Sequence, residues 1–339
     1  MAKRAFWAPG RVNLIGEYTD LVGGVVLPAA LDLGIRVEVS PAAGISLRSD
    51  TFREDAVAAA DGGEFSGSGW ARYVAAVAQE LALLGRPAVG IQGAITSTVP
   101  VGAGLSSSAA LEVAVAVALC GVADFDLDPM LLAQAAQRAE LRAVGVPCGI
   151  MDQAAAVLGR AGCALLLDTG SLEHQAVELP EDIAIVVIDS GVSRSLESSQ
   201  YALRKHELEQ ALSGAGEPND PLLARRRRHV ETENARVRAV VEALRAKRVA
   251  ELADLFRKGH ESLRDDLEVT IPELDRLVEL AYASGALAAR MTGAGFGGAV
   301  VALARSGEAS EVAARVVARY GPRGRSYVCR ASGGARELG

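Results

Sequence analysis

Gly102 to Ser108 is a run of small and hydroxyl-bearing residues that stands directly before an apolar stretch ending at Leu119. Gly102 and Gly104 lack a Cβ where a ligand would approach the backbone, and Ser106 to Ser108 would place hydroxyls and N–H groups at the mouth of a helix. The first turn of a helix leaves N–H groups unpaired and carries the positive end of the helix dipole, so it can receive a polyphosphate. No lysine follows the second glycine, so phosphate binding would rest on backbone amides, hydroxyls and a metal. A glycine-rich helix cap that binds nothing explains the segment equally well.

Polar and charged side chains also crowd a short segment near the start of the chain, between apolar runs and with glycines on both sides. They are Arg11, Asn13, Glu17, Tyr18, Thr19 and Asp20. Charge at such a place is costly unless a partner compensates it. Carboxylates spaced like Glu17 and Asp20 can accept hydrogen bonds from vicinal hydroxyls. The alternative is a solvated hairpin with an internal arginine–carboxylate pair.

Two further acids stand in the same half of the chain. Asp152 follows two glycines and a proline and precedes the apolar run Ala154 to Leu158. We therefore expect Asp152 in the first turn of a helix, where a carboxylate is favoured. Glu140 lies near the end of a helix expected over Leu131 to Ala143. Asp152 could be a helix-start charge only, but a phosphate-binding loop, an acidic loop and an isolated acid coincide in one half of the chain.

Composition limits the classes of protein to consider. The chain has 339 residues, half of them apolar, which is enough for two domains. The net charge of −7 opposes a general affinity for nucleic acid. The mean hydropathy of +0.21 reflects alanine and valine, and no apolar run is long enough to cross a bilayer. Four cysteines without CxxC or zinc spacing make a reducing cytoplasm the simplest expectation.

Strands and helices at regular spacing must position these residues. We expect strands on both sides of the polar loop within residues 6–30, and then at Ile35–Val39, Ile45–Leu47, Ile91–Ser97, Cys163–Asp168 and Ile183–Asp189. We expect helices at Trp70–Leu84, Ala109–Leu119, Leu131–Ala143, from Asp152 to Leu158, Leu196–Leu212 and Leu222–Leu244. Ala56–Gly69 is predicted to be irregular. A hinge at Pro180–Asp182 would divide the chain into domains of residues 1–180 and 181–339.

Some notable residues have simple structural interpretations. Trp70 at a helix start could stack on an adenine, although a tryptophan there is more often part of the core. The four arginines from Arg225 to Arg228 go round a helix, which favours a solvated helix over a nucleic-acid patch. His229 is predicted to be a structural histidine. Met291 to Gly298 could place its backbone against a second ligand surface.

Three separated segments resemble the signature motifs of the GHMP small-molecule kinases, and among these the galactokinases. They are Ala8–Leu27, Pro100–Glu112 and Arg290–Val300. Four more segments are similar to galactokinase segments in the family's order: Cys148–Gln153, Ser199–Tyr201, His229–Arg236 and Leu263–Pro272. An ordered set over nearly the whole chain is far more specific than one motif.

The resemblance implies an α+β fold of two lobes with the active site in the cleft between them. It implies that Mg-ATP phosphorylates a sugar at its anomeric hydroxyl, and in the galactokinases this sugar is galactose. The expected partners are therefore small molecules and not nucleic acid or a membrane. A monomer is compatible with this function. Asp152 resembles the catalytic aspartate and Arg11 its partner. Ser108 and Glu140 resemble the magnesium ligands. Glu17, Asp20, Gly149 and Tyr201 resemble the sugar contacts of the family, and we expect Tyr18 and Thr19 beside them. The triphosphate loop of the family is resembled by Gly102, Ala103, Gly104, Leu105, Ser106, Ser107 and Ser108, and we expect Trp70 to complete the ATP-binding positions.

One departure from the galactokinase pattern concerns the sugar. Tyr18 replaces a histidine that in the family helps to hold the hydroxymethyl end of the sugar, and Leu21 and Val22 make the loop more apolar. A kinase of a related sugar, such as arabinose, N-acetylgalactosamine or a deoxy sugar, is therefore an alternative. A non-catalytic sensor of sugar and ATP is another, but the intact Arg11, Glu140 and Asp152 argue against it.

Overall fold

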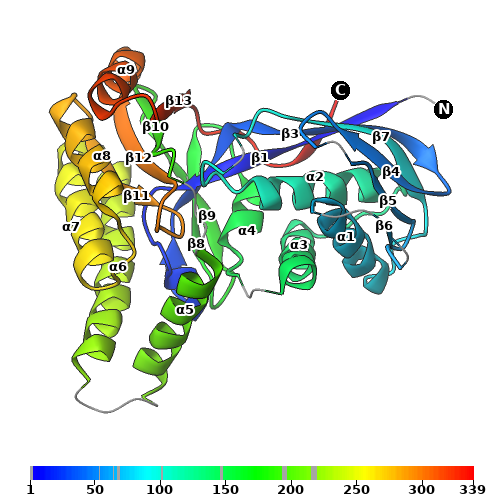
Figure 1. The fold of residues 1–339 in the computed structure, drawn as a ribbon, viewed down its shortest axis with the longest axis horizontal. Helices are drawn as coiled ribbons and strands as arrows, with labels where there is room; N and C mark the ends of the chain where they lie inside the picture. The colour runs from blue at the N-terminus through cyan, green and yellow to red at the C-terminus, as the bar shows by residue number, and fades with distance from the viewer. Residues whose placement is uncertain are drawn as a thin grey trace.

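The computed structural model describes residues 3–339 except 53, 64, 67–68, 101, 146–147, 193–196 and 215–219. Figure 1 shows two lobes, with a sheet and the helices α1 to α4 in the first and the helices α6 to α9 around a second sheet in the other. The two-lobed α+β architecture expected above is confirmed.

The first lobe is built on a seven-stranded sheet of order β14-β1-β3-β7-β4-β5-β6. The pair β4–β7 is parallel and the other pairs are antiparallel. The strands are β1 (Arg4–Asn13), β3 (Pro28–Ala42), β4 (Gly44–Ser49), β5 (Ala56–Ala59), β6 (Phe65–Ser66), β7 (Gly90–Ser97) and β14 (Arg336–Leu338). β1 therefore lies between β3 and β14, which are far apart in the sequence.

Four helices cover one face of this sheet (Figure 1): α1 (Ala71–Leu83), α2 (Ser107–Val122), α3 (Pro129–Val144) and α4 (Met151–Leu158). α2 is rich in alanine and valine and packs against β1 and β3, so almost all of it is buried. Its Gly121 allows close packing, because a Cβ there would lie 2.5 Å from the ring of Phe6. α3 starts where the side chain of Asp128 accepts hydrogen bonds from two backbone N–H groups, and it ends at Gly145 with a φ of 73°.

A small three-stranded sheet, β2-β8-β9, lies beside the first lobe. It is made of β2 (Val25–Val26), β8 (Cys163–Asp168) and β9 (His174–Glu178). Just before β2 the polar loop contains the single 3₁₀ turn η1 (Thr19–Val22). The loop is thereby tied to the strand that follows α4.

The second lobe has an antiparallel sheet of order β11-β12-β10-β13. The strands are β10 (Ile183–Asp189), β11 (Ala288–Thr292), β12 (Ala299–Arg305) and β13 (Arg325–Cys329). β10 to β12 are apolar along almost their whole length and are buried by the surrounding helices. The helical elements are α5 (Glu197–Ser213), α6 (Pro221–Arg245), η2 (Val249–Glu251), α7 (Leu252–Asp265), α8 (Pro272–Ala283) and α9 (Ala309–Tyr320).

Two predictions about local structure were wrong. Residues 56–69 are not irregular throughout, because β5 and β6 extend the first sheet there. The arginine run is not simply solvated, because Arg226 is 1% exposed and pairs with Glu207 at 2.7 Å and with Glu268 at 2.8 Å. The predicted start of α5 at Leu196 lies outside the described residues. No helix in the described part of the chain has both the length and the apolar character needed to cross a membrane.

The division at residue 180 stays a prediction. Residues 180–182 connect β9 to β10, as a boundary there requires. The end of the chain, however, returns to the first lobe, where β14 pairs with β1 and Leu31 forms a bridge with Ala331.

Candidate active site

The loop before α2 has a backbone suited to an anion. Gly102, Gly104 and Ser106 have φ values of 81°, 74° and 53°, so left-handed residues alternate along the loop. Such a backbone turns successive N–H groups toward one side and forms a concave anion site. Arg11 fixes the loop with two hydrogen bonds: its backbone N–H donates to Leu105 O at 3.2 Å, and its Nη1 donates to Gly104 O at 2.9 Å. Its ligand-binding role remains a prediction.

Asp152 and Arg11 form a bidentate pair at the edge of this loop. Nε of Arg11 donates to Oδ1 at 2.6 Å and Nη2 donates to Oδ2 at 2.7 Å, while the hydroxyl of Ser106 also donates to Oδ2. The Arg11 side chain is 7% exposed and that of Asp152 is 27% exposed. The arginine is therefore fixed by the fold, and the carboxylate reaches the space above the loop.

Ser108 and Glu140 also meet, as the sequence suggested. The Ser108 hydroxyl donates to Glu140 Oε1 at 2.9 Å, and Gln153 Nε2 donates to Glu140 Oε2 at 2.6 Å and to Glu112 Oε2 at 3.0 Å. Burial raises the pKa of Glu140, and the charge of Asp152 adds to that effect. The pKa of Glu112 is raised well above its ordinary value by burial and by Glu140. This corner of the site has a surplus of buried negative charge.

The polar loop brings Glu17, Tyr18 and Asp20 to the same space. Burial raises the pKa of Asp20 to about 7, with Asp152 raising it further and Arg11 opposing. Gly149 makes room for Asp20, because a Cβ at Gly149 would lie 1.8 Å from Asp20 Oδ2. The sequence named both residues, and their close contact explains why a glycine stands at that position.

Two residues of the polar loop have internal partners. The Tyr18 hydroxyl donates to Ala294 O at 2.6 Å, and its ring lies 5.4 Å from that of Tyr201 on α5. Tyr18 still borders the cavity, but its hydroxyl proton is already donated to Ala294 O. Thr19 is fully buried, with its hydroxyl 2.8 Å from both Gly16 O and Val25 O, and it does not line the space.

A buried ion network lies behind the loop, and the sequence did not reveal it. Arg290 Nη2 lies 2.7 Å from Glu17 Oε2 and 2.7 Å from Glu233 Oε1, and the Gly16 N–H donates to the same Glu233 oxygen at 2.9 Å. Burial raises the pKa of Glu17 to about 7, against the pull of Arg290. His229 contacts Glu17 O at 3.1 Å, which confirms a structural histidine. β11 and α6 thus hold the polar loop from the second lobe.

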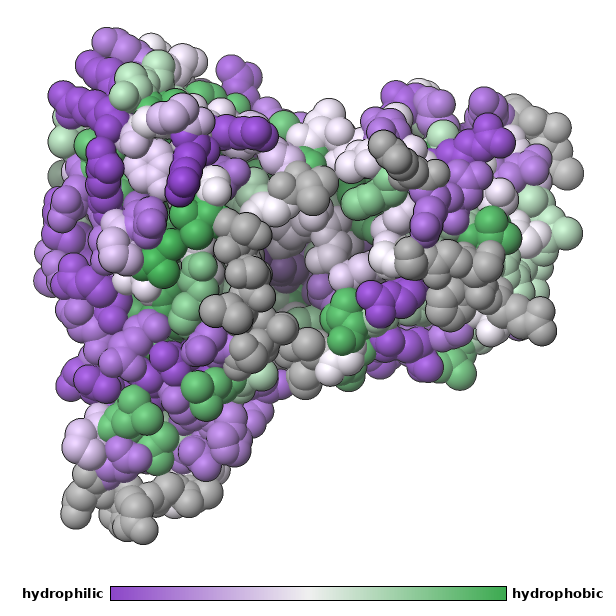
Figure 2. Space-filling view, viewed as in Figure 1, coloured by the Kyte–Doolittle hydropathy of each residue, from purple (hydrophilic) through white to green (hydrophobic). Residues whose placement is uncertain are grey.

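One cavity of about 1040 Å³ lies between the lobes. Its lining includes the phosphate loop, the Asp152–Arg11 pair and Glu140, and also Glu17, Tyr18, Asp20 and Tyr201. Figure 2 shows a hollow there with hydrophilic residues at its base. The second lobe contributes a wall of residues that sequence reasoning mostly missed: Asp189, Gly191, Val192, Gly293, Ala294, Pro322, Arg323 and Arg325. Only Gly293 and Ala294 carried a signal, in the glycine-rich segment after β11. Ala103 and Thr19 are the predicted positions that do not border either cavity.

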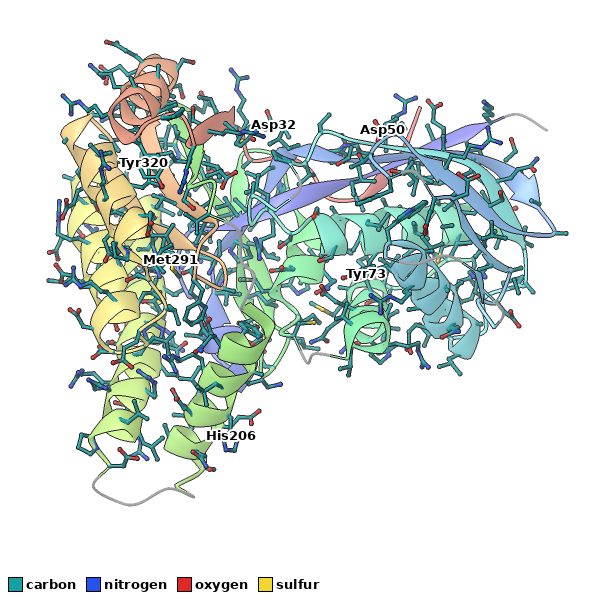
Figure 3. The ribbon with its side chains drawn as sticks, in the orientation of Figure 1. Asp32, Asp50, Tyr73, His206, Met291 and Tyr320 are labelled. Atoms are coloured by element: carbon teal, nitrogen blue, oxygen red, sulfur yellow. The ribbon has the colours of Figure 1, made fainter. Side chains whose placement is uncertain are left out.

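A second, apolar cavity of about 270 Å³ adjoins the loop and shares Ser107 and Ser108 with the first. Trp70 lines it and is also part of the core, at 6% exposed. Its indole N–H donates to Glu54 O at 3.0 Å, and its ring stacks on Phe52 with centroids 6.2 Å apart. Both interpretations of Trp70 therefore fit the geometry. In Figure 3 the nearby Tyr73, which also lines this cavity, lies in the first lobe.

The arrangement suits transfer of a charged group between two bound molecules. One cavity joins a backbone anion site, a carboxylate paired with arginine, and acids that can accept hydrogen bonds from hydroxyls. Phosphoryl transfer needs such positioning and charge neutralisation more than covalent help.

Comparisons with known proteins agree with this chemistry. Family models of the N-terminal and C-terminal domains of GHMP kinases match residues 72–160 and 240–323, and a galactokinase galactose-binding signature matches residues 2–41. The structure is similar to Lactococcus lactis galactokinase complexed with galactose, with a TM-score of 0.92 and 30% identity over 99% of this chain and 95% of that one. It also shares the fold of Methanococcus jannaschii mevalonate kinase, with a TM-score of 0.74 and 20% identity over 97% and 98% of the two chains.

Proposed function

The chain belongs to the GHMP kinases, and we propose that it is a galactokinase, which transfers the terminal phosphoryl group of ATP to the anomeric hydroxyl of galactose. The products are galactose 1-phosphate and ADP. The observation that carries the proposal is the single cavity that joins the Asp152–Arg11 pair to the glycine-rich loop on one side and to Asp20 on the other.

The residues suggest how the reaction proceeds. The anomeric oxygen forms a bond to the terminal phosphorus as the bond from that phosphorus to the bridging oxygen of ADP breaks. Asp152 accepts a hydrogen bond from the attacking hydroxyl and takes its proton, and Arg11 holds the carboxylate in place. In a loose transition state much of the contribution of Asp152 is orientation of the hydroxyl.

Magnesium fits the acidic corner beside the loop. Ser108 and Glu140 would hold it together with the phosphates of the nucleotide, because hard oxygen ligands suit this ion and it is seldom held by an all-protein cage. Two observations favour a cation here. The buried Glu112 Oε1 has no hydrogen-bond partner among the described residues. The negative charge of Glu140 raises the pKa of Glu112, and that of Asp152 raises the pKa of Glu140, beyond the effect of burial. When bound, the ion neutralises charge on the phosphates.

The smaller cavity is a suitable place for the base of ATP. It is apolar, it carries the aromatic rings of Trp70, Phe52 and Tyr73, and it opens onto the same serines as the phosphate loop. An adenine ring could lie among these aromatic side chains while its phosphates reach Ser107 and Ser108.

The sugar would lie against the polar loop and the start of α4. Asp20 and Gly149 border its position, and Glu17, Tyr18 and Tyr201 border the cavity further into the second lobe. Because Tyr18 stands where galactokinases have a histidine, a kinase of a related sugar is the second candidate. Arabinose and deoxy sugars, which lack a hydroxyl that galactose has, are therefore the alternative substrates to test.

We also propose a cytoplasmic monomer. The four cysteines are all free in the structure, which agrees with a reducing compartment.

An ATP-consumption assay over a panel of monosaccharides tests the function. We expect galactose to give the highest kcat/KM, with ³¹P NMR showing an anomeric phosphate as product. Asp152→Asn is the matched control for contaminating kinases, and its rate should fall to background. Highest kcat/KM with another sugar would contradict the galactokinase assignment, and absence of transfer to every sugar would favour a sensor.

A further inference from the structure

Two arginines of the second lobe border the large cavity that the phosphate loop also borders. Arg325 is the first residue of β13, and Arg323 lies in the turn that joins α9 to β13. Figure 3 labels Tyr320, the last residue of α9, in the second lobe just before this turn. Neither arginine belongs to the glycine-rich segments that the sequence singled out.

The fold fixes the backbone of this turn against the end of β10. Tyr320 donates its hydroxyl to Ser190 O at 3.0 Å. Gly191 has a φ of 65°, and a Cβ there would lie 2.4 Å from Arg323 O, so only glycine lets the two segments approach so closely. Arg325 is directly opposite Asp189 in the β10–β13 pairing. Both side chains are thus carried by a positioned backbone rather than by a free loop.

Neither guanidinium has a hydrogen-bond or ion-pair partner in the described part of the chain, and both residues are exposed at the cavity. The charge of Arg323 does act on the neighbouring Tyr320, where it partly opposes the rise in the pKa of the phenol that burial causes. The nearest candidate acid, Asp189, uses Oδ1 to accept the N–H of Gly191 at 3.0 Å, and it makes no ion pair with the arginine across the strand.

The lining of the cavity carries more negative than positive side chains, which suggests a role for these arginines. Among its described lining residues, five carboxylates face three guanidiniums: Glu17, Asp20, Glu140, Asp152 and Asp189 against Arg11, Arg323 and Arg325. Arg11 is already engaged by Asp152 and Gly104. A polyphosphate that enters this acidic space therefore finds Arg323 and Arg325 as the unengaged cations of the described lining.

We propose that Arg323 and Arg325 form a subsite for the terminal phosphate of the nucleotide, so that the triphosphate is held by the loop of the first lobe and by these arginines of the second. This inference rests on ATP as the phosphoryl donor in the proposed function. The terminal phosphate is the one that lies toward the acceptor, and both arginines border the same cavity as the proposed acceptor positions Asp20 and Tyr201. A planar guanidinium can donate two parallel hydrogen bonds to phosphate oxygens, which suits it to this role.

Binding measurements without sugar test the subsite. The variant Arg323→Gln/Arg325→Gln is compared with the unmodified protein for affinity toward Mg-ADP and toward the non-hydrolysable Mg-AMPPNP, by calorimetry. We expect AMPPNP to bind about tenfold more weakly or worse, because hydrogen bonds to charged groups contribute on that scale. ADP should change by less than about twofold, since it lacks the terminal phosphate. Arg330→Gln, an exposed arginine just beyond β13 that does not line the cavity, is the matched control.

The outcomes separate this inference from the proposed function. Equal weakening of ADP and AMPPNP would overturn the terminal-phosphate subsite, and so would unchanged affinity for both. A protein that discriminates the two nucleotides as expected but transfers nothing to galactose would keep the subsite and refute the sugar assignment. Because the two side chains have no partners, the variant should fold, and its thermal unfolding and circular dichroism should match those of the Arg330→Gln control.

Discussion

Asp20→Asn should make the sugar-free protein more stable, by an amount that grows with pH. In the folded protein the pKa of Asp20 is raised from 3.8 to about 7, because the carboxylate is buried and lies near Asp152. Between these two values the folded protein keeps a proton that the unfolded chain releases. The free energy of unfolding therefore falls as pH rises through this window. An asparagine, which never ionises, avoids that loss.

The size of the effect follows from the two pKa values. Each pKa unit corresponds to about 1.36 kcal/mol, so the interval from 3.8 to about 7 sets a ceiling of about 4 kcal/mol above pH 7. Water in the cavity can solvate the carboxylate, which reduces the cost. We expect Asp20→Asn to raise the free energy of unfolding by about 2 to 4 kcal/mol at pH 8 and by less than about 1 kcal/mol at pH 4. Glu17 titrates in the same direction but is common to both proteins, so it cancels in the difference.

Urea denaturation followed by tryptophan fluorescence measures this difference at pH 4, 5, 6, 7 and 8. Asp254→Asn is the control, because it removes an exposed carboxylate paired only with Lys258 on the surface of α7 and should change stability by less than about 1 kcal/mol. A stabilisation by Asp20→Asn that is the same at pH 4 and pH 8 would refute the reasoning. The same variant should lose affinity for galactose, which isothermal titration can measure.

Three further predictions concern the reaction. Asp152→Asn should lower kcat by about 10² to 10⁴-fold with Kd for Mg-ADP nearly unchanged, and substantial remaining turnover would show that Asp152 is not the acid–base group. Glu140→Ala and Ser108→Ala should each raise KM for Mg-ATP, with partial rescue at high magnesium concentration, and an unchanged magnesium dependence in both would contradict the metal site. Tyr18 borders the cavity, and its hydroxyl donates to Ala294 O. Tyr18→His should therefore change the ratios of kcat/KM among galactose, its 6-deoxy analogue and the corresponding pentose by several-fold, which is about the effect of one neutral hydrogen bond. Unchanged ratios would make the tyrosine a packing substitution.

Strong local patterns allowed most of the fold to be predicted. The predicted bounds of β8 and β10 match the structure, because both strands are continuous apolar runs ended by aspartate. β5 was missed because alanine has a low preference for strands, so Ala56–Ala59 gave no signal without the neighbouring strand β4. Arg226 was misjudged for a similar reason. Its partners Glu207 on α5 and Glu268 after α7 lie 19 and 42 residues away, and their proximity depends on how α5 and α7 pack against α6.

The first-lobe half of the site could be predicted, but in the second-lobe half only Tyr201 and the glycine-rich segment with Gly293 and Ala294 were indicated by the sequence. Gly102–Ser108, Asp152 and Asp20 stand in distinctive segments, and the structure brings them to one cavity. Arg290 sits in an apolar strand, where nothing local indicates an ion pair with Glu17 some 270 residues earlier. Arg323 looks like an ordinary surface residue of a turn. The role of such residues can be recognised only from contacts between the lobes, which the local sequence does not show.

The return of the last strand to the first sheet bears on how the protein folds as it is synthesised. β1 pairs with a strand far along the chain, β14, and Arg4 forms an ion pair at 2.7 Å with Glu337, which lies 333 residues later. Until this pairing forms, one edge of β1 offers unpaired backbone groups to other chains. A contact between segments so far apart in sequence forms slowly, so nascent chains are open to aggregation through this edge until β14 has been synthesised and has paired with β1.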